Sequence, residues 1–234
     1  MKKILLLITI LLINKLEAQV IPVFPTKPKV KVEAKPKMKA VVKEPNLPKC
    51  NLPIIEMVNV GNFSIGKYEV TQAQWVAVMG SNPSYFKGDN LPVEQVSWDD
   101  VQIFIQKLNT LTGKKYRLPT ESEWEFAAKG GIQSHGYNYA GSNDLSVVAW
   151  YEENSVNTTQ PVGQKQPNEL SIYDLSGNVE EWVNDLWGDK AFGFRVYRGG
   201  SWIRTAAYCL LTYRCYGNHS LRSSFLGFRM VSSE

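Results

Sequence analysis

The segment Asp174–Trp182 carries the residue types that bind a hard cation. Within eight residues it places carboxylates, the flexible Gly177 and several backbone carbonyls. Oxygen ligands of this kind suit Ca²⁺. The same composition also fits a Ser-Gly-Asn turn followed by a solvated pair of glutamates. Composition alone therefore leaves a cation site and a plain turn open.

Three cysteines are the other candidates for metal or redox chemistry: Cys50, Cys209 and Cys215. An odd number in an exported protein leaves one thiol unpaired or pairing between chains. They are too few for a disulfide framework, and with only His135 and His219 beside them they lack the spacing of zinc ligands. Each histidine fits a surface loop better than a metal site.

The last part of the chain has the composition of a binding surface. Tyr208, Tyr213 and Tyr216 offer large amphipathic contact areas at low entropic cost. They follow no period of 2 or 3.6 that would turn them all inward, although a place in the core is the alternative. Adaptable polar residues lie among them: Arg204, Asn218 and Ser223.

Charge is unevenly distributed over the 234 residues, whose formal net charge is +4. Residues 1–18 carry +2 and residues 19–49 carry +6, so residues 50–234 carry −4. Phosphate binding needs Lys and Arg on the folded surface, whereas the lysines here gather in a tail. We therefore expect no nucleic-acid partner, and one acidic domain over residues 50–234.

Two segments precede that domain. Residues 1–18 combine two lysines with the apolar run Ile4–Ile13, which predicts a secretory signal peptide and no stable membrane span after its removal; an uncleaved anchor is the alternative. Residues 19–49 alternate Pro, Lys and Val, which indicates an extended linker that acts as a spacer or contacts anionic envelope polymers. We expect export to the periplasm, the cell surface or the medium.

Few regular elements are predicted to position the candidate residues. Helices are expected from Thr71 to Gly80, from Ser97 to Gly113 and from Thr120 to Gly130, because each begins with a cap residue and ends at glycine. Ile54–Val60 and Arg195–Tyr197 could be strands. Most of residues 131–234 lacks periodicity, so loops fixed by buried tryptophans or a cation are expected there.

Several stretches together resemble the formylglycine-generating enzyme family of sulfatase-modifying factors, a branch of the C-type-lectin-like folds. They occur in family order: Gly66–Thr71, Pro92–Trp98, Tyr116–Phe126, Asp174–Trp182, Arg198–Trp202 and Gly227–Arg229. The resemblance implies a compact α+β domain with little regular secondary structure. It also implies a structural Ca²⁺ site formed by the side chains of Asp174 and Glu181 and the carbonyls of Gly177 and Val179.

The enzyme of that family oxidises a sulfatase cysteine to formylglycine with a pair of copper-binding cysteines. Soft thiolates suit Cu(I), and two are needed to hold it. Arg204 stands at the first of the two cysteine positions and Cys209 at the second, while Cys215 matches neither. Copper and a catalytic Cys209 are therefore expected only if an oxidase persists. Cys209 otherwise fits a small buried hydrophobic residue.

The end of the chain is more similar to the variable proteins that retroelements diversify on the same fold. Fixed positions are matched by Ala206, Cys209, Arg214, Arg222 and Gly227–Arg229. Residues 203–226 contain no Lys, Glu, Gln, Trp or Met, the residues that adenine randomisation of an AAY codon cannot produce. The variable, ligand-binding positions implied are Ile203, Arg204, Thr205, Ala207, Tyr208, Tyr213, Cys215, Tyr216, Gly217, Asn218, Leu221, Ser223, Ser224 and Phe225.

The leading hypothesis is an exported, non-enzymatic protein that presents residues 203–226 to a protein or glycan ligand at a cell surface. Leu210, His219 and Ser220 depart from the variable-protein pattern, so an ordinary non-catalytic relative of that family is also consistent with the segment. Two further hypotheses stay open, a formylglycine-generating oxidase and a structural envelope protein.

Overall fold

The computed structural model describes residues 54–189 and 192–233. The predicted signal peptide, the linker and Cys50 lie outside these residues. The chain divides into two units, Met1–Leu47 and Pro48–Glu234, and the second contains all the described residues. In this part of the chain, no helix is both long and apolar enough to cross a bilayer.

Three capped helices lie where the sequence predicts them: α1 Gln72–Met79, α2 Trp98–Thr112 and α3 Glu121–Ala128. Each begins with a capping box, in which the cap hydroxyl accepts from the third residue's N–H and that residue's side chain accepts from the cap N–H. Gly80 and Gly113 end the first two with φ of 81° and 70°, a conformation that costs glycine little. Shorter helices follow: η1 Gly131–Gln133, α4 Leu145–Val148 and η3 Ala206–Cys209.

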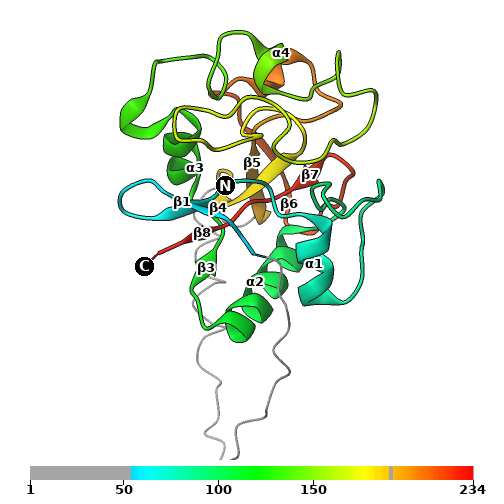
Figure 1. The fold of residues 1–234 in the computed structure, drawn as a ribbon. Coiled ribbons are helices and arrows are strands. Elements are labelled where there is room, and N and C mark those ends of the chain that lie inside the picture. Colours follow the sequence, from blue (N-terminus) through cyan, green and yellow to red (C-terminus); the bar gives the residue numbers. More distant parts are fainter. Residues whose placement is uncertain (1–53, 190–191, 234) are drawn as a thin grey trace, which may run out of the picture. The chain divides into compact units, whose positions relative to one another are not determined.

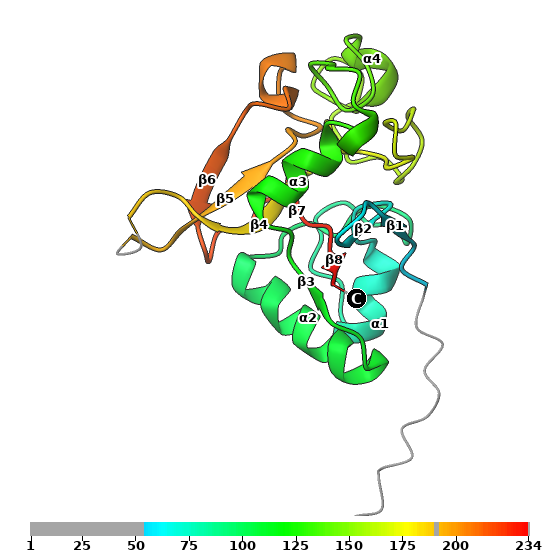
Figure 2. The same cartoon turned by 90° about the vertical axis from the view of Figure 1, so that its left-hand side faces the viewer.

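Within the described residues, eight short strands form two sheets. The first has the order β1 (Met57–Asn59), β2 (Ser64–Gly66), β8 (Val231–Ser232), β3 (Tyr116–Arg117), all antiparallel. The second has the order β6 (Cys215–Asn218), β5 (Phe194–Arg198), β4 (Glu180–Leu186), β7 (Leu226–Gly227), with the β4–β7 pair parallel. β1 and β5 confirm the two predicted strands. Figures 1 and 2 show β6 at the outer edge of the second sheet.

Buried aromatic side chains join the helices to the loops. Trp75 stacks on Phe104 with ring centroids 5.0 Å apart, and both rings meet the edge of Phe228. Trp182 is fully buried and donates its indole N–H to the Val96 carbonyl at 3.0 Å. A buried indole needs such an acceptor, so each bond fixes one loop carbonyl in place. These contacts hold a mixed α+β fold of low helix content, as the family resemblance implies.

Candidate functional site

The fourteen predicted ligand-binding residues lie on one continuous segment that follows β5, and none of them is buried. Ile203 and Tyr216 are the most exposed large apolar side chains among them, at 47% and 49%. By contrast, the fixed positions Cys209 and Gly227–Arg229 are all buried. Six of the fourteen positions are exposed and eight are half-buried, and Cys215, Leu221 and Phe225 pack against the core. Among the other fixed positions, Ala206 is half-buried and Arg214 and Arg222 are exposed. The three tyrosines are not core residues.

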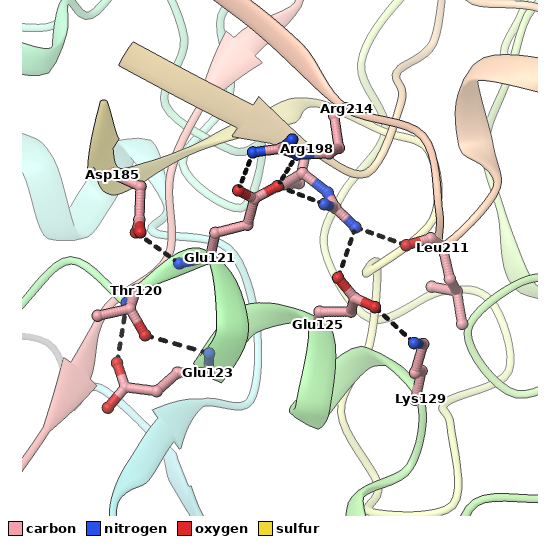
Figure 3. A network of polar contacts seen from close by, with 9 residues as sticks. All are labelled: Thr120, Glu121, Glu123, Glu125, Lys129, Asp185, Arg198, Leu211 and Arg214. Atoms are coloured by element: carbon pink, nitrogen blue, oxygen red, sulfur yellow. Dashed lines mark hydrogen bonds and ion pairs between the residues drawn. The ribbon is translucent and has the colours of Figure 1, made fainter. Parts of the chain in front are cut away.

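One end of β6 is fixed to the first turn of α3. Arg214 donates from Nε and Nη2 to the two oxygens of Glu121, at 2.5 Å each, and buried Arg198 donates to the same carboxylate at 2.6 Å (Figure 3). Arg198 also donates to the Leu211 carbonyl. A carboxylate in the first turn of a helix is favoured by the helix dipole, and two arginines hold it there. The hydrogen bonds of Arg214 and Arg198 lower the pKa of Glu121, although its partial burial acts in the opposite direction.

The other end of β6 is fixed to α2. Arg222 donates to both oxygens of Asp100, and His219 Nδ1 lies 2.5 Å from Asp99. The side chains of Arg214 and Arg222 are about half exposed, yet each binds both oxygens of a carboxylate, so both act as anchors. These two contacts give a structural role to Arg214 and Arg222, both of which the resemblance assigns to fixed positions.

The three tyrosines of the C-terminal segment fall into two groups. Tyr208 and Tyr213 lie against each other with ring centroids 4.6 Å apart. Tyr216 stacks on Trp187 at 4.6 Å and 13°, and its edge meets Phe194. Trp187 and Phe194 lie outside the C-terminal segment, so a search limited to residues 203–226 misses them. The alternation of half-buried and exposed residues in β6 places Tyr216 on the solvent side.

Arg204 lies over a buried carboxylate in place of the first family cysteine. Its Nε lies 3.1 Å from an oxygen of Glu180, which is only 1% exposed, and its guanidinium covers the rings of Tyr208 and Phe225. Burial raises the pKa of Glu180, whereas the charge of Arg204 lowers it. Cys215 Sγ lies 3.5 Å from the same carboxylate, and burial with that negative charge raises its pKa to about 12.

Cys209 is fully buried and electrostatically unsuited to form a thiolate. Burial raises the pKa of its thiol to about 12, and the charge of Glu180 acts in the same direction. A Cβ on Gly200, whose φ is 73°, would lie 2.6 Å from Cys209 Sγ, so the chain passes close against the sulfur. Reactive cysteines have lowered pKa values and some exposure. The surroundings of Cys209 fit a packing residue.

The predicted cation donors lie on a tight turn that leads into β4. Gly177 adopts φ of 82°, and a Cβ there would overlap the backbone of Trp150. Asp174 accepts from Gly163 N–H at 2.7 Å. Glu181 accepts from Arg229 at both oxygens, at 2.7 Å each, and from the Trp124 indole. One of the two predicted carboxylates is therefore already paired.

A third buried carboxylate, Glu69, joins this cluster. It accepts from the Asn178 side chain at 2.6 Å and from Val179 N–H. Burial and the charges of Asp174 and Glu181 raise the pKa of Glu69 well above its ordinary value, and burial raises that of Asp174 to about 6. Three acids surround one guanidinium, that of Arg229.

The predicted donors fit a cation in part. The excess of buried negative charge favours one, because an unpaired buried carboxylate is costly. The pairing of Glu181 with Arg229 opposes its use as a ligand. Within residues 54–189 and 192–233, no group of three His, Cys, Asp or Glu side chains is placed to hold a metal. Calcium therefore stays a prediction.

The chain is similar in sequence and in fold to proteins of one known family. The family model of the sulfatase-modifying factor enzyme 1-like domain matches residues 38–234. The chain is 37% identical over 209 residues to the chaperone protein LppX of Paenibacillus barcinonensis, covering 67% of this chain and 75% of that one. It is 32% identical to the formylglycine-generating enzyme of Mus musculus, covering 70% of this chain but only half the length of the enzyme. The solved structure of Treponema denticola variable protein 1 superposes with a TM-score of 0.70 at 30% identity, covering 77% of this chain and 92% of that one.

Proposed function

The chain belongs to the family of the sulfatase-modifying factor enzyme 1-like domain, and on that premise we propose that it is an exported, non-enzymatic binding protein. It presents the segment 203–226 to a protein or glycan ligand at a cell surface. The observation that carries this proposal is the accessibility of the segment: none of its predicted variable positions is buried, whereas Cys209 within it and Gly227–Arg229 directly after it are buried. The structural similarity to a variable protein supports the same branch of the family.

The tethers at Arg214 and Arg222 support the proposal because they limit the entropy lost on binding. A loop that is already held at both ends loses less freedom when a ligand orders it. Half-exposed Tyr216, stacked on Trp187, and Tyr208 beside Tyr213 would supply contact area.

The surroundings of Arg204 and Cys209 oppose an oxidase function. Copper chemistry needs two thiolates, whereas here an arginine paired with Glu180 stands at one position and a buried thiol at the other. The test combines Cu(I) with the full chain and a cysteine-containing sulfatase peptide, and follows the peptide by mass spectrometry. The proposal expects no copper bound at Cys209 and no aldehyde formed. Copper binding that is lost in Cys209→Ser, with turnover, would establish the oxidase.

Export and calcium complete the proposal. Residues 1–18 would direct export, and residues 19–49 would hold the acidic domain on a basic spacer that contacts anionic envelope polymers. A Ca²⁺ ion near Asp174 would offset the surplus negative charge of the three buried acids and stiffen the turn below the binding segment. A purely structural envelope role would need no such exposed surface, so loss of ligand binding without loss of folding distinguishes the two.

A further inference from the structure

A cavity of about 710 Å³ opens between α1, the loop 81–87 and the start of α2. Trp75, Met79 and Val96 form its apolar part, and Tyr85, which is 70% exposed, stands at its rim. Its volume is within the range of small-molecule sites, about 300 to 1,000 Å³. The cavity adjoins the C-terminal segment through Arg222, but it contains none of the fourteen predicted ligand-binding residues.

Two fully buried polar side chains hold the loop that walls the cavity. Gln72 donates to the Phe86 carbonyl at 2.9 Å and accepts from Gly88 N–H at 3.1 Å and from the Asn82 amide at 2.7 Å. Glu94 accepts from Phe86 N–H at 2.8 Å, while its other oxygen has no partner in the described part of the chain. Burying such groups is costly, and most of their bonds go to this loop. The wall that carries Tyr85 is therefore preorganised.

The net charge of the groups that line the cavity is positive, because Lys87 and Arg222 outnumber Asp100. Asp100 is already saturated, because it accepts from Ser97 N–H and Oγ and from Arg222 Nε and Nη2. Arg222 keeps Nη1 for a ligand. Lys87 uses one of its three donors for the Asn82 carbonyl at 3.1 Å, which leaves two. In a domain of net −4, the cavity thus combines apolar walls with the ammonium of Lys87 and with the remaining N–H donors of Arg222, whose charge is paired with Asp100.

We propose that this cavity binds a carboxylate carried on an aromatic or branched apolar body. The body packs on Trp75 and Met79 beneath Tyr85, and the carboxylate accepts from Lys87 and Arg222. Charge complementarity selects the anion, and the apolar walls select its bulk. Both the C-terminal residue of a polypeptide and a free aromatic acid have this chemistry. The site goes beyond the surface proposed above and is independent of it.

The test titrates the full chain with N-acetylphenylalanine and with its amide, which lacks the charge, and follows backbone and tryptophan indole resonances by NMR. We expect the acid to shift the Trp75 indole and the resonances of residues 81–87, and the amide to bind about tenfold more weakly. The peptide Gly-Gly-Phe, which has a free C-terminal carboxylate, tests whether the ligand is a polypeptide terminus or a free acid. Binding like that of the acid indicates a polypeptide terminus, and absence of its binding, while the acid binds, indicates a free acid.

Three variants keep the test independent of folding. Lys87→Gln removes an exposed donor and is expected to weaken acid binding about tenfold, whereas Lys107→Gln, an exposed lysine on α2, leaves it unchanged. Tyr85→Ala is expected to weaken the binding of the acid and of the amide equally, because it removes an apolar contact that both ligands make. Equal binding of acid and amide, shifts confined to residues outside the cavity, or no shifts at millimolar ligand would overturn the proposal.

Discussion

Arg222 donates to both oxygens of Asp100, at 2.7 and 2.8 Å, across 122 residues of sequence. Asp100 is also the residue that closes the capping box of α2, since it accepts from Ser97 N–H. One carboxylate therefore both starts a helix and fixes the C-terminal segment. The hydrogen bonds from Arg222 and Ser97 lower the pKa of Asp100, although burial opposes them.

Arg222→Lys tests this tether, because lysine keeps the charge but loses the planar two-point contact. The pair is half exposed, so the free energy of unfolding should fall by about 1 kcal/mol or less. Hydrogen exchange of residues 215–225, measured by mass spectrometry, should nevertheless rise, and Arg222→Gln should raise it further. Unchanged exchange in both variants would show that the segment is held by other contacts.

Arg204→Met should be much more damaging, because it leaves the Glu180 carboxylate buried without its cation. We expect a loss of about 2 to 4 kcal/mol in the free energy of unfolding, measured in urea. The pKa of Glu180, already raised by burial, should rise further without Arg204. An acid whose pKa is raised in the folded state stabilises the fold below its unfolded pKa, and this stabilisation is lost as the pH rises through the folded pKa. The stability difference between wild type and Arg204→Met should therefore grow toward alkaline pH. The double variant with Glu180→Gln should recover most of the loss, and failure to do so would contradict the pairing.

The acid cluster around Arg229 predicts stabilisation by calcium. Ligand at about 100 times its dissociation constant adds about 2.7 kcal/mol to the free energy of unfolding. Calorimetry with Ca²⁺ and then with a chelator should show a higher Tm that the chelator reverses. Asp174→Asn should abolish the response, whereas Glu152→Gln, an exposed acid, should not. Equal Tm values with Ca²⁺ and with chelator would mean that protonation of the acids, and not a bound cation, neutralises the excess negative charge of the cluster.

Glu94 predicts a specific pH dependence. Burial raises its pKa to about 7, so its contribution to stability is complete below the unfolded value of about 4.5 and is lost as pH rises through 7. One pKa unit corresponds to about 1.4 kcal/mol. Between about pH 4.5 and 7, the free energy of unfolding of wild type should therefore fall by on the order of 3 kcal/mol more than that of Glu94→Gln. Urea unfolding of the two proteins across this pH range measures the difference. Parallel stability curves would show that Glu94 ionises normally.

Local signals make the helices predictable from the sequence. Ser97 and Asp100 lie three residues apart and specify the start of α2 without help from the rest of the chain. The C-terminal segment is recognisable from its composition, and its exposure agrees with that interpretation. Its ligand-binding role stays a prediction.

The contacts that hold the site depend on long-range packing that no local pattern contains. Glu69 lies more than 100 residues from Asn178, yet the two form a buried hydrogen bond. Composition groups Glu180 with a cation-binding turn, whereas in the structure it begins β4 and pairs with Arg204. Trp187 joins Tyr216 only because β4, β5 and β6 are neighbours in one sheet. Such pairings are decided by the sheet order, which the sequence does not state.

Binding by the C-terminal surface is the central claim, and an array of cell-surface glycans and exported proteins tests it most directly. Wild type, Tyr208→Ala/Tyr216→Ala and the control Phe126→Ala, an exposed aromatic residue on α3, are applied in parallel, with Tm measured for each. The account predicts that the control retains the ligand bound by wild type and that the double variant loses it while its Tm falls by no more than a few degrees. Retention of that ligand by the double variant, or its failure to fold, would contradict the account.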